Sequence, residues 1–146
     1  MSAHPLDYLD SISHQIVKKW TDQLSHSNTH YATRPMSELE ATTRECLSAY
    51  LTAIKDDDYE PLNDFIASIA FFRGSMQFTE HEVVDAFRLF RKIASDYLLA
   101  GLVSDEVDID PLSDAIDGIC QVVDYTILRF SEIYYSARAN QAANTS

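Results

Sequence analysis

The chain has 146 residues, three glycines, four prolines and a formal net charge of −12. This length suits one domain with a substantial core, and the composition, which is 46% hydrophobic, favours a compact helical protein over a turn-rich β fold or a disordered chain. The acidic charge argues against nucleic acids and anionic membranes as partners, because both attract a basic surface.

Apolar residues recur at intervals of three and four along most of the chain, which is the period of amphipathic helices. They predict an all-α protein with five helices, at about residues 5–25, 38–55, 60–75, 80–100 and 111–139. We expect residues 1–139 to form a single domain and residues 140–146 to be a frayed tail, because this tail carries no large apolar residue. A helical bundle is the expected architecture, and a globin-like arrangement is the alternative, since periodicity does not distinguish these topologies.

The first two helices are separated by the polar run from residue 25 to residue 35, which predicts a loop. Ser37 and Glu40 have the spacing of a capping box, in which the two side chains satisfy backbone N–H groups at a helix start. The second helix should end near Lys55, because the three aspartates at 56–58 are unfavourable at a helix C-terminus and favourable at the start of the next helix.

The connection between the third and fourth helices carries the most specific local signals. Thr79 and Glu82 form a second capping box, so a helix should begin at Glu80. Phe78 before the cap and Val83 within the helix have the spacing of a hydrophobic staple, which fixes the angle of entry. These residues predict a short and rigid corner.

Arg73 lies in the last turn of the third helix, where the helix dipole favours a cation. It is expected within reach of Glu82 or Asp85. Two interpretations stay open at this point: a buried ion pair that fixes the corner, or a contact with an anion.

The order and spacing of these residues resemble the RsbRD-type N-terminal domain family. The resemblance covers about residues 14 to 100 and rests on motifs in successive helices, namely Ile16-Val17 with Trp20, Ser37 with Leu39, Pro61-Leu62 with Phe65, and Arg73, Gln77-Phe78, Glu82-Val83, Ala86-Phe87 and Phe90-Arg91. At Gln77 the family more often has a small residue. Members of this family stand at the front of stressosome co-antagonists of the RsbR group and of some bacterial histidine kinases.

The last predicted helix follows Asp110-Pro111, a good cap and first residue. Its apolar residues alternate in steps of four and three, which is a heptad stripe that favours a partner helix lying nearly parallel to it. We expect this stripe to form the face of a homodimer, with the completion of the chain's own bundle as the alternative. The candidate dimer and signalling face consists of Ile116, Cys120, Val123, Ile127, Phe130 and Tyr134.

Catalytic and cofactor chemistry finds no support in the sequence. The five histidines have no metal-ligand spacing, and no Gly-flanked serine, no Cys/His pair close in sequence and no Gly-rich phosphate loop occurs. We therefore expect no catalytic residue, no metal and no cofactor. The many aromatic residues are expected to fill the core, with a small-molecule pocket as the alternative.

The predicted compartment is the cytoplasm, because the sequence shows no secretory leader and no run of about 20 apolar residues. Together with the family resemblance, this gives a non-catalytic sensory or regulatory input domain of a bacterial signalling protein. The domain is expected to dimerise and to transmit a signal through its last helix. The resemblance implies an output domain, such as a STAS or histidine-kinase module, or a partner signalling protein. The alternatives are a free-standing helical interaction module and a globin-like domain that binds a small ligand.

Overall fold

The structure is a computed structural model that describes the backbone of residues 2–145 and the side chains of residues 2–137, 139 and 140. Six α-helices and one 3₁₀ helix make up this part of the chain, which is all-α as predicted. They are α1 (Pro5–Ser11), α2 (Ser13–Ser25), η1 (His30–Thr33), α3 (Met36–Asp56), α4 (Glu60–Ser75), α5 (Glu80–Val103) and α6 (Leu112–Thr145).

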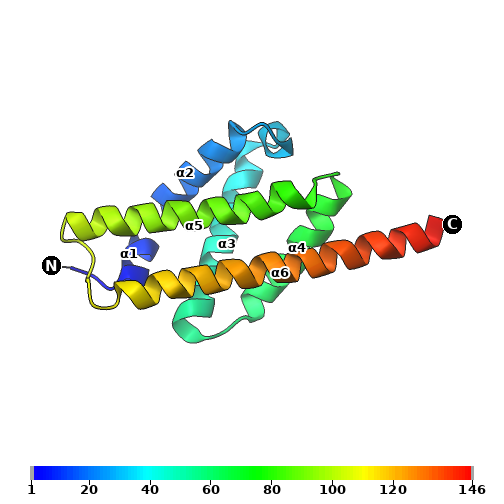
Figure 1. The fold of residues 1–146 in the computed structure, drawn as a ribbon. Coiled ribbons are helices and arrows are strands. Elements are labelled where there is room, and N and C mark those ends of the chain that lie inside the picture. Colours follow the sequence, from blue (N-terminus) through cyan, green and yellow to red (C-terminus); the bar gives the residue numbers. More distant parts are fainter. Residues whose placement is uncertain (1, 146) are drawn as a thin grey trace.

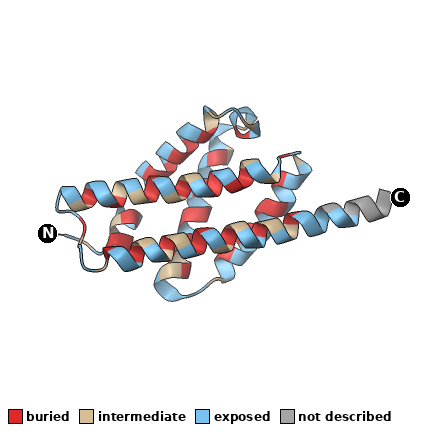
Figure 2. Ribbon diagram, in the orientation of Figure 1, coloured by how far each residue is buried: buried red, intermediate tan, exposed pale blue. Residues whose placement is uncertain are grey.

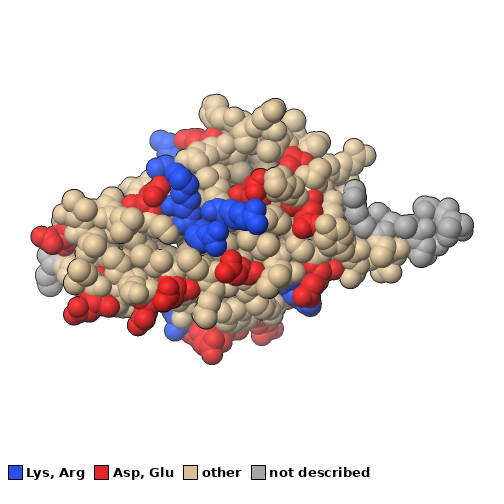
Figure 3. Space-filling view, in the orientation of Figure 1, with Lys and Arg blue, Asp and Glu red and all other residues tan. Residues whose placement is uncertain are grey.

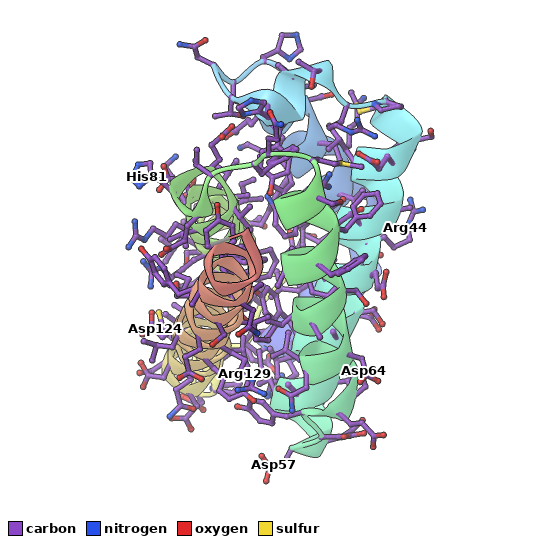
Figure 4. The ribbon with its side chains drawn as sticks, turned by 90° about the vertical axis from the view of Figure 1, so that its right-hand side faces the viewer. Arg44, Asp57, Asp64, His81, Asp124 and Arg129 are labelled. Atoms are coloured by element: carbon purple, nitrogen blue, oxygen red, sulfur yellow. The ribbon has the colours of Figure 1, made fainter. Side chains whose placement is uncertain are left out.

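The helices form two layers (Figure 1). The long helices α5 and α6 run antiparallel, side by side, and cross steeply over α3 and α4. Seen from the side, α6 points towards the viewer while α3 and α4 run upright beside it (Figure 4). Both α4 and α5 pack on α6, and α2 packs on α3.

Several predicted helix boundaries are wrong. The expected helix over residues 5–25 is broken at Ile12, whose ψ of 21° departs from helical geometry. The second predicted helix begins at Met36 and has Pro35 as its N-cap, so the expected capping box of Ser37 and Glu40 does not start it. The last helix continues to Thr145, because the alanine-rich end of the chain contains neither glycine nor proline to stop it.

Buried residues from α1 to α6 form one hydrophobic core cluster (Figure 2). Its centre is aromatic: the ring of Phe90 lies 5.1 Å from that of Trp20 and 4.9 Å from that of Tyr50, between ring centroids. The Trp20 indole N–H donates to the carbonyl of Ala86, which fixes α2 against α5. Aromatic rings therefore join α5 to the helices beneath it, since Trp20 belongs to α2, Tyr50 to α3 and Phe90 to α5.

Opposite charges also link the two long helices. Lys and Arg side chains gather over the middle of α5, and Asp and Glu side chains lie along the neighbouring edge (Figure 3). Arg91 on α5 forms an ion pair with Asp124 on α6, at 3.3 Å between Nη1 and Oδ1. The exposed position of this ion pair makes its contribution to stability small.

Gly101 lies inside the last turns of α5 rather than at the helix end. A Cβ atom at this position would lie 2.6 Å from Val107 Cγ2 and 3.0 Å from the Tyr8 ring. The absence of a side chain therefore allows the α5–α6 connection and α1 to pack closely against α5.

We expect Gly101→Ala to lower the free energy of unfolding by about 1–3 kcal/mol, because the new methyl group overpacks this contact. The matched control is Gly74→Ala in α4, where a Cβ would meet nothing within 4 Å. This substitution should stabilise the helix by about 0.5–1 kcal/mol. Urea unfolding measures both changes. Equal effects of the two substitutions would contradict the assignment.

Candidate functional site

The C-terminus of α4 places Arg73 against Phe78. The N–H of Phe78 donates to the carbonyl of Arg73 at 3.1 Å, and the N–H of Gln77 donates to that of Gly74 at 3.3 Å. These two bonds are those of a Schellman motif, which ends a helix with one residue in the left-handed conformation. Gln77 holds that position with a φ of 64°, which explains why a small residue suits it. The motif fixes the Arg73 side chain beside the Phe78 ring.

The guanidinium of Arg73 is buried among aromatic rings. Its side chain is 1% exposed, and its central carbon lies 4.9 Å from the ring centroid of Phe78, 5.1 Å from that of Tyr31 and 5.5 Å from that of Phe72. Such contacts are favourable because the faces of the rings carry negative electrostatic potential. Burial raises the pKa of the Tyr31 phenol, so that this ring remains neutral beside the cation.

Arg73 forms its ion pair with Glu38 of α3, at 3.3 Å between Nη1 and Oε2. The expected pairing with Glu82 or Asp85 is therefore wrong. The same carboxylate accepts hydrogen bonds from Arg34 Nε at 2.7 Å and Arg34 Nη2 at 2.8 Å. The hydrogen bonds from Arg34 hold the pKa of Glu38 below its ordinary value, against the opposing effect of burial and with further help from Arg73.

Glu82 connects the start of α5 to η1. Its carboxylate closes the predicted capping box with Thr79, and it also accepts hydrogen bonds from the backbone N–H of His30 at 2.6 Å and from the His30 ring at 2.8 Å. Burial alone would raise the pKa of Glu82, but the N–H groups and side chains of His30 and Thr79 bind the charged form and lower the pKa to about 2. Glu82 is therefore unavailable to Arg73.

A cavity of about 20 Å³ lies beside Arg73, between the two layers of helices. The two threonine hydroxyl groups in its wall are occupied, since Thr42 donates to the carbonyl of Glu38 and Thr43 to that of Leu39. The remaining wall is almost entirely apolar. The lining residues are Trp20, Leu24, Tyr31, Leu39, Thr42, Thr43, Cys46, Phe65, Ile69, Arg73, Ala86 and Phe87.

The corner between α4 and α5 is also joined to α6. The hydroxyl of Tyr134 donates to the carbonyl of Phe78 at 3.1 Å, and the hydroxyl of Ser131 donates to the carboxylate of Glu80 at 3.0 Å. A displacement of Phe78 would therefore act directly on the C-terminal half of α6.

The predicted stripe of α6 is divided by the fold. Val123, Phe130 and Tyr134 are buried in the chain's own core. Ile116, Cys120 and Ile127 are half-buried at its border. Buried side chains have no surface for a second molecule, so only the half-buried members remain for such a contact. The large apolar residues exposed on α6 are Leu128 and Tyr135, which the sequence analysis did not single out.

Sequence reasoning identified Arg73, Phe78 and Glu82 but missed their partners in η1 and early α3. Arg34 and Glu38 are four residues apart across a helix start, which is a spacing that favours an ion pair. Tyr31 is a large aromatic residue within an otherwise polar run, which indicates burial. Both signals are present in the sequence, but no local sequence pattern connects these residues to Arg73.

No helix within residues 2–145 is long and apolar enough to cross a bilayer. The same range holds no group of three or more His, Cys, Asp or Glu residues arranged to bind a metal ion. Both cysteines are free thiols.

The family model of the RsbT co-antagonist protein rsbRD N-terminal domain matches residues 14–146. This match confirms the resemblance seen in the sequence and extends it over α6. No curated protein and no solved structure matches the chain significantly.

Glu82→Gln keeps the shape of the side chain but removes its charge. Because the folded-state pKa of about 2 lies below the ordinary value of 4.5, the carboxylate stabilises the fold fully above about pH 4.5, and this contribution is lost as the pH falls through about 2. We expect the variant to lose about 2 kcal/mol of unfolding free energy at neutral pH and much less near pH 2.

Urea unfolding at several pH values measures this difference. The matched control is Glu45→Gln, at an exposed position of α3, which should change stability by less than about 0.5 kcal/mol. A Glu82→Gln effect of the same size at neutral pH and near pH 2 would disprove the role of the ionised carboxylate.

Proposed function

Since the chain belongs to the family of RsbT co-antagonist protein rsbRD N-terminal domains, we propose that it is the sensory input domain of a signalling protein and that α6 carries its signal. Family membership identifies a regulatory domain. The proposal adds three elements: a homodimer, the route of the signal, and a cytoplasmic partner or output module that receives it.

The observation that carries the proposal is the course of α6. This helix packs against α4 and α5 as far as Tyr134, and its C-terminal end extends beyond the rest of the fold (Figure 1). A continuous helix transmits a shift or rotation along its length, because its backbone hydrogen bonds keep it rigid. A displacement at the core end is therefore transmitted to the projecting end.

The exposed face of α6 is suited to a second copy of the chain. Leu128 is 67% exposed and Tyr135 is 62% exposed, and a separation of seven residues places them on the same side of the helix. Asp124, one helical turn before Leu128, and Arg129, directly after it, lie at the surface of α6 (Figure 4). An apolar centre with charged neighbours is typical of a helix–helix contact between subunits.

In the proposed dimer, two α6 helices pack in parallel through Leu128 and Tyr135. The half-buried Ile116, Cys120 and Ile127 lie closer to the core and would border this contact. Parallel packing directs both C-termini towards the same receiver. A stimulus that changes the packing of α6 then shifts the population between two arrangements of the pair.

The proposal is tested by the solution mass of the wild type and of the double variant Leu128→Glu with Tyr135→Glu, measured by light scattering. We expect twice 16.5 kDa for the wild type and 16.5 kDa for a folded variant, because carboxylates on the contact face repel each other across the interface.

Val103→Glu is the matched control, because Val103 is also an exposed apolar residue but is the last residue of α5. This end of α5 lies at the opposite end of the molecule from the projecting end of α6 (Figure 1). This control should remain a dimer. A monomeric wild type, or a double variant that stays dimeric, would refute the proposed interface.

A further inference from the structure

We infer that the end of the molecule at the α5–α6 connection is a docking surface for a basic amphipathic helix of a partner protein. This end surface consists of the exposed apolar side chains of Leu99, Val103 and Ile109 and of the carboxylates around them. It lies at the opposite end of the molecule from the projecting end of α6 (Figure 1). The inference therefore goes beyond the proposed function and does not depend on the α6 dimer.

The end surface has an apolar centre. Val103 is 87% exposed, Ile109 is 68% exposed and Leu99 is 50% exposed. Leu102 and Val103 follow Leu99 by three and four residues, so the three side chains form one apolar face over the last turns of α5. Leu102 and Ile109 also line a surface groove of about 750 Å³. Exposed apolar residues with a polar border are typical of a site that binds another protein.

The charges of the end surface indicate which kind of partner fits it. Residues 93–128 contain eight Asp and Glu residues and neither Lys nor Arg. Asp105, Asp108 and Asp110 line the groove, and none of them forms an ion pair with another described residue. Figure 3 shows Asp and Glu side chains at this end of the molecule and no Lys or Arg there on the face in view. Such a field repels nucleic acids and anionic membranes, whereas it attracts a protein segment rich in Lys and Arg.

The backbone of the connection favours a helix over an extended peptide as the occupant. The N–H groups of Glu106 and Val107 donate to the carbonyl of Gly101, at 2.8 and 3.2 Å. The N–H of Asp108 donates to the carbonyl of Ala3 at 2.8 Å. An extended peptide docks by pairing with free backbone groups, and these N–H groups are already bonded. A helix satisfies its own backbone and contacts a surface through side chains alone, so it suits this end of the molecule.

The same hydrogen bonds hold the end surface in a fixed shape. Val107 is 3% exposed and packs against Gly101, where a Cβ atom would lie 2.6 Å from its Cγ2. Ile109, two residues further on, is therefore presented from an anchored backbone and does not fold onto the core. A surface that is already ordered loses little conformational entropy when a partner binds.

The inference is tested with a synthetic helical peptide that carries leucine on one face and lysine on the other. Its binding to the full chain is measured by fluorescence anisotropy of a fluorescein label on the peptide. One control peptide has glutamate in place of lysine, and a second has serine in place of leucine. We expect a dissociation constant of about 1–100 μM for the Leu/Lys peptide and binding at least about tenfold weaker for each control peptide.

Two double variants of the chain locate the apolar contact. Val103→Ser with Ile109→Ser removes the apolar centre of the end surface, and Leu128→Ser with Tyr135→Ser removes an exposed apolar pair on α6. We expect the first variant to weaken binding at least about tenfold and the second by less than about twofold. Equal weakening by both variants, or no binding of the Leu/Lys peptide to the wild type, would overturn the inference.

A second pair of variants separates the end surface from the net charge of the chain. Asp105→Asn with Asp110→Asn removes two charges from the groove, and Asp56→Asn with Asp57→Asn removes two exposed charges at the α3–α4 connection. Each variant includes one residue in the left-handed conformation, with a φ of 61° at Asp105 and 52° at Asp57, which Asn tolerates. At low ionic strength we expect about fivefold weaker binding for the first variant and less than about twofold for the second. Equal weakening would reveal a non-specific attraction and contradict the inference.

A second copy of the chain is the alternative occupant, although its net charge of −12 opposes contact with an acidic surface. Light scattering on Val103→Ser with Ile109→Ser distinguishes the two. We expect this variant to have the same solution mass as the wild type, and a lower mass would assign the end surface to a contact between copies and overturn the inference. The mass of the wild type itself tests the α6 dimer separately.

Discussion

The buried guanidinium of Arg73 is the constraint on which the arrangement of the other elements depends. A charged group in the interior requires an opposite charge and favourable neighbours, so the fold brings Glu38 from α3, Tyr31 from η1 and Phe78 from the α4–α5 corner to one place. The Schellman motif at the end of α4 and the capping box at the start of α5 fix the backbone on both sides of this group. The segment from Tyr31 to Glu38 thus meets the α4–α5 corner, although Glu38 lies 35 residues before Arg73 in the sequence.

Local signals in the sequence predict much of the α4–α5 corner. They do not predict the long-range contacts of this corner. The start of α5 at Glu80 follows from Thr79 and Glu82, which are three residues apart. The partner of Arg73 lies 35 residues away, and no local pattern connects Arg73 to Glu38. The break at Ile12 is not marked by a glycine or proline in the sequence. The periodic pattern therefore predicts one continuous helix across it.

The face of α6 shows how periodicity can identify a helix and still misplace its orientation. The buried side combines Val123, Phe130 and Tyr134 of the predicted stripe with a second row, spaced by three and four as well, that consists of Leu112, Ala115, Ile119, Val122 and Thr126. Both sets satisfy the heptad rule, and the predicted set is the more apolar one. The fold instead buries the small Ala115 and Thr126, because α6 must approach α4 and α5 closely, and it leaves Leu128 and Tyr135 at the surface. The side of a helix that is buried depends on the shape of the neighbouring helices. The apolar pattern of one helix does not contain this information.

The central claim of this account is that the environment of Arg73 is coupled to the C-terminal half of α6 through Phe78 and Tyr134. The most direct test is amide hydrogen exchange of the wild type, Arg73→Met and Arg44→Met, followed segment by segment. The account predicts faster exchange in Arg73→Met at the α4–α5 corner and in α6 around residues 131–135, with Arg44→Met unchanged. Faster exchange confined to α3 and α4, with α6 protected as in the wild type, would contradict the coupling.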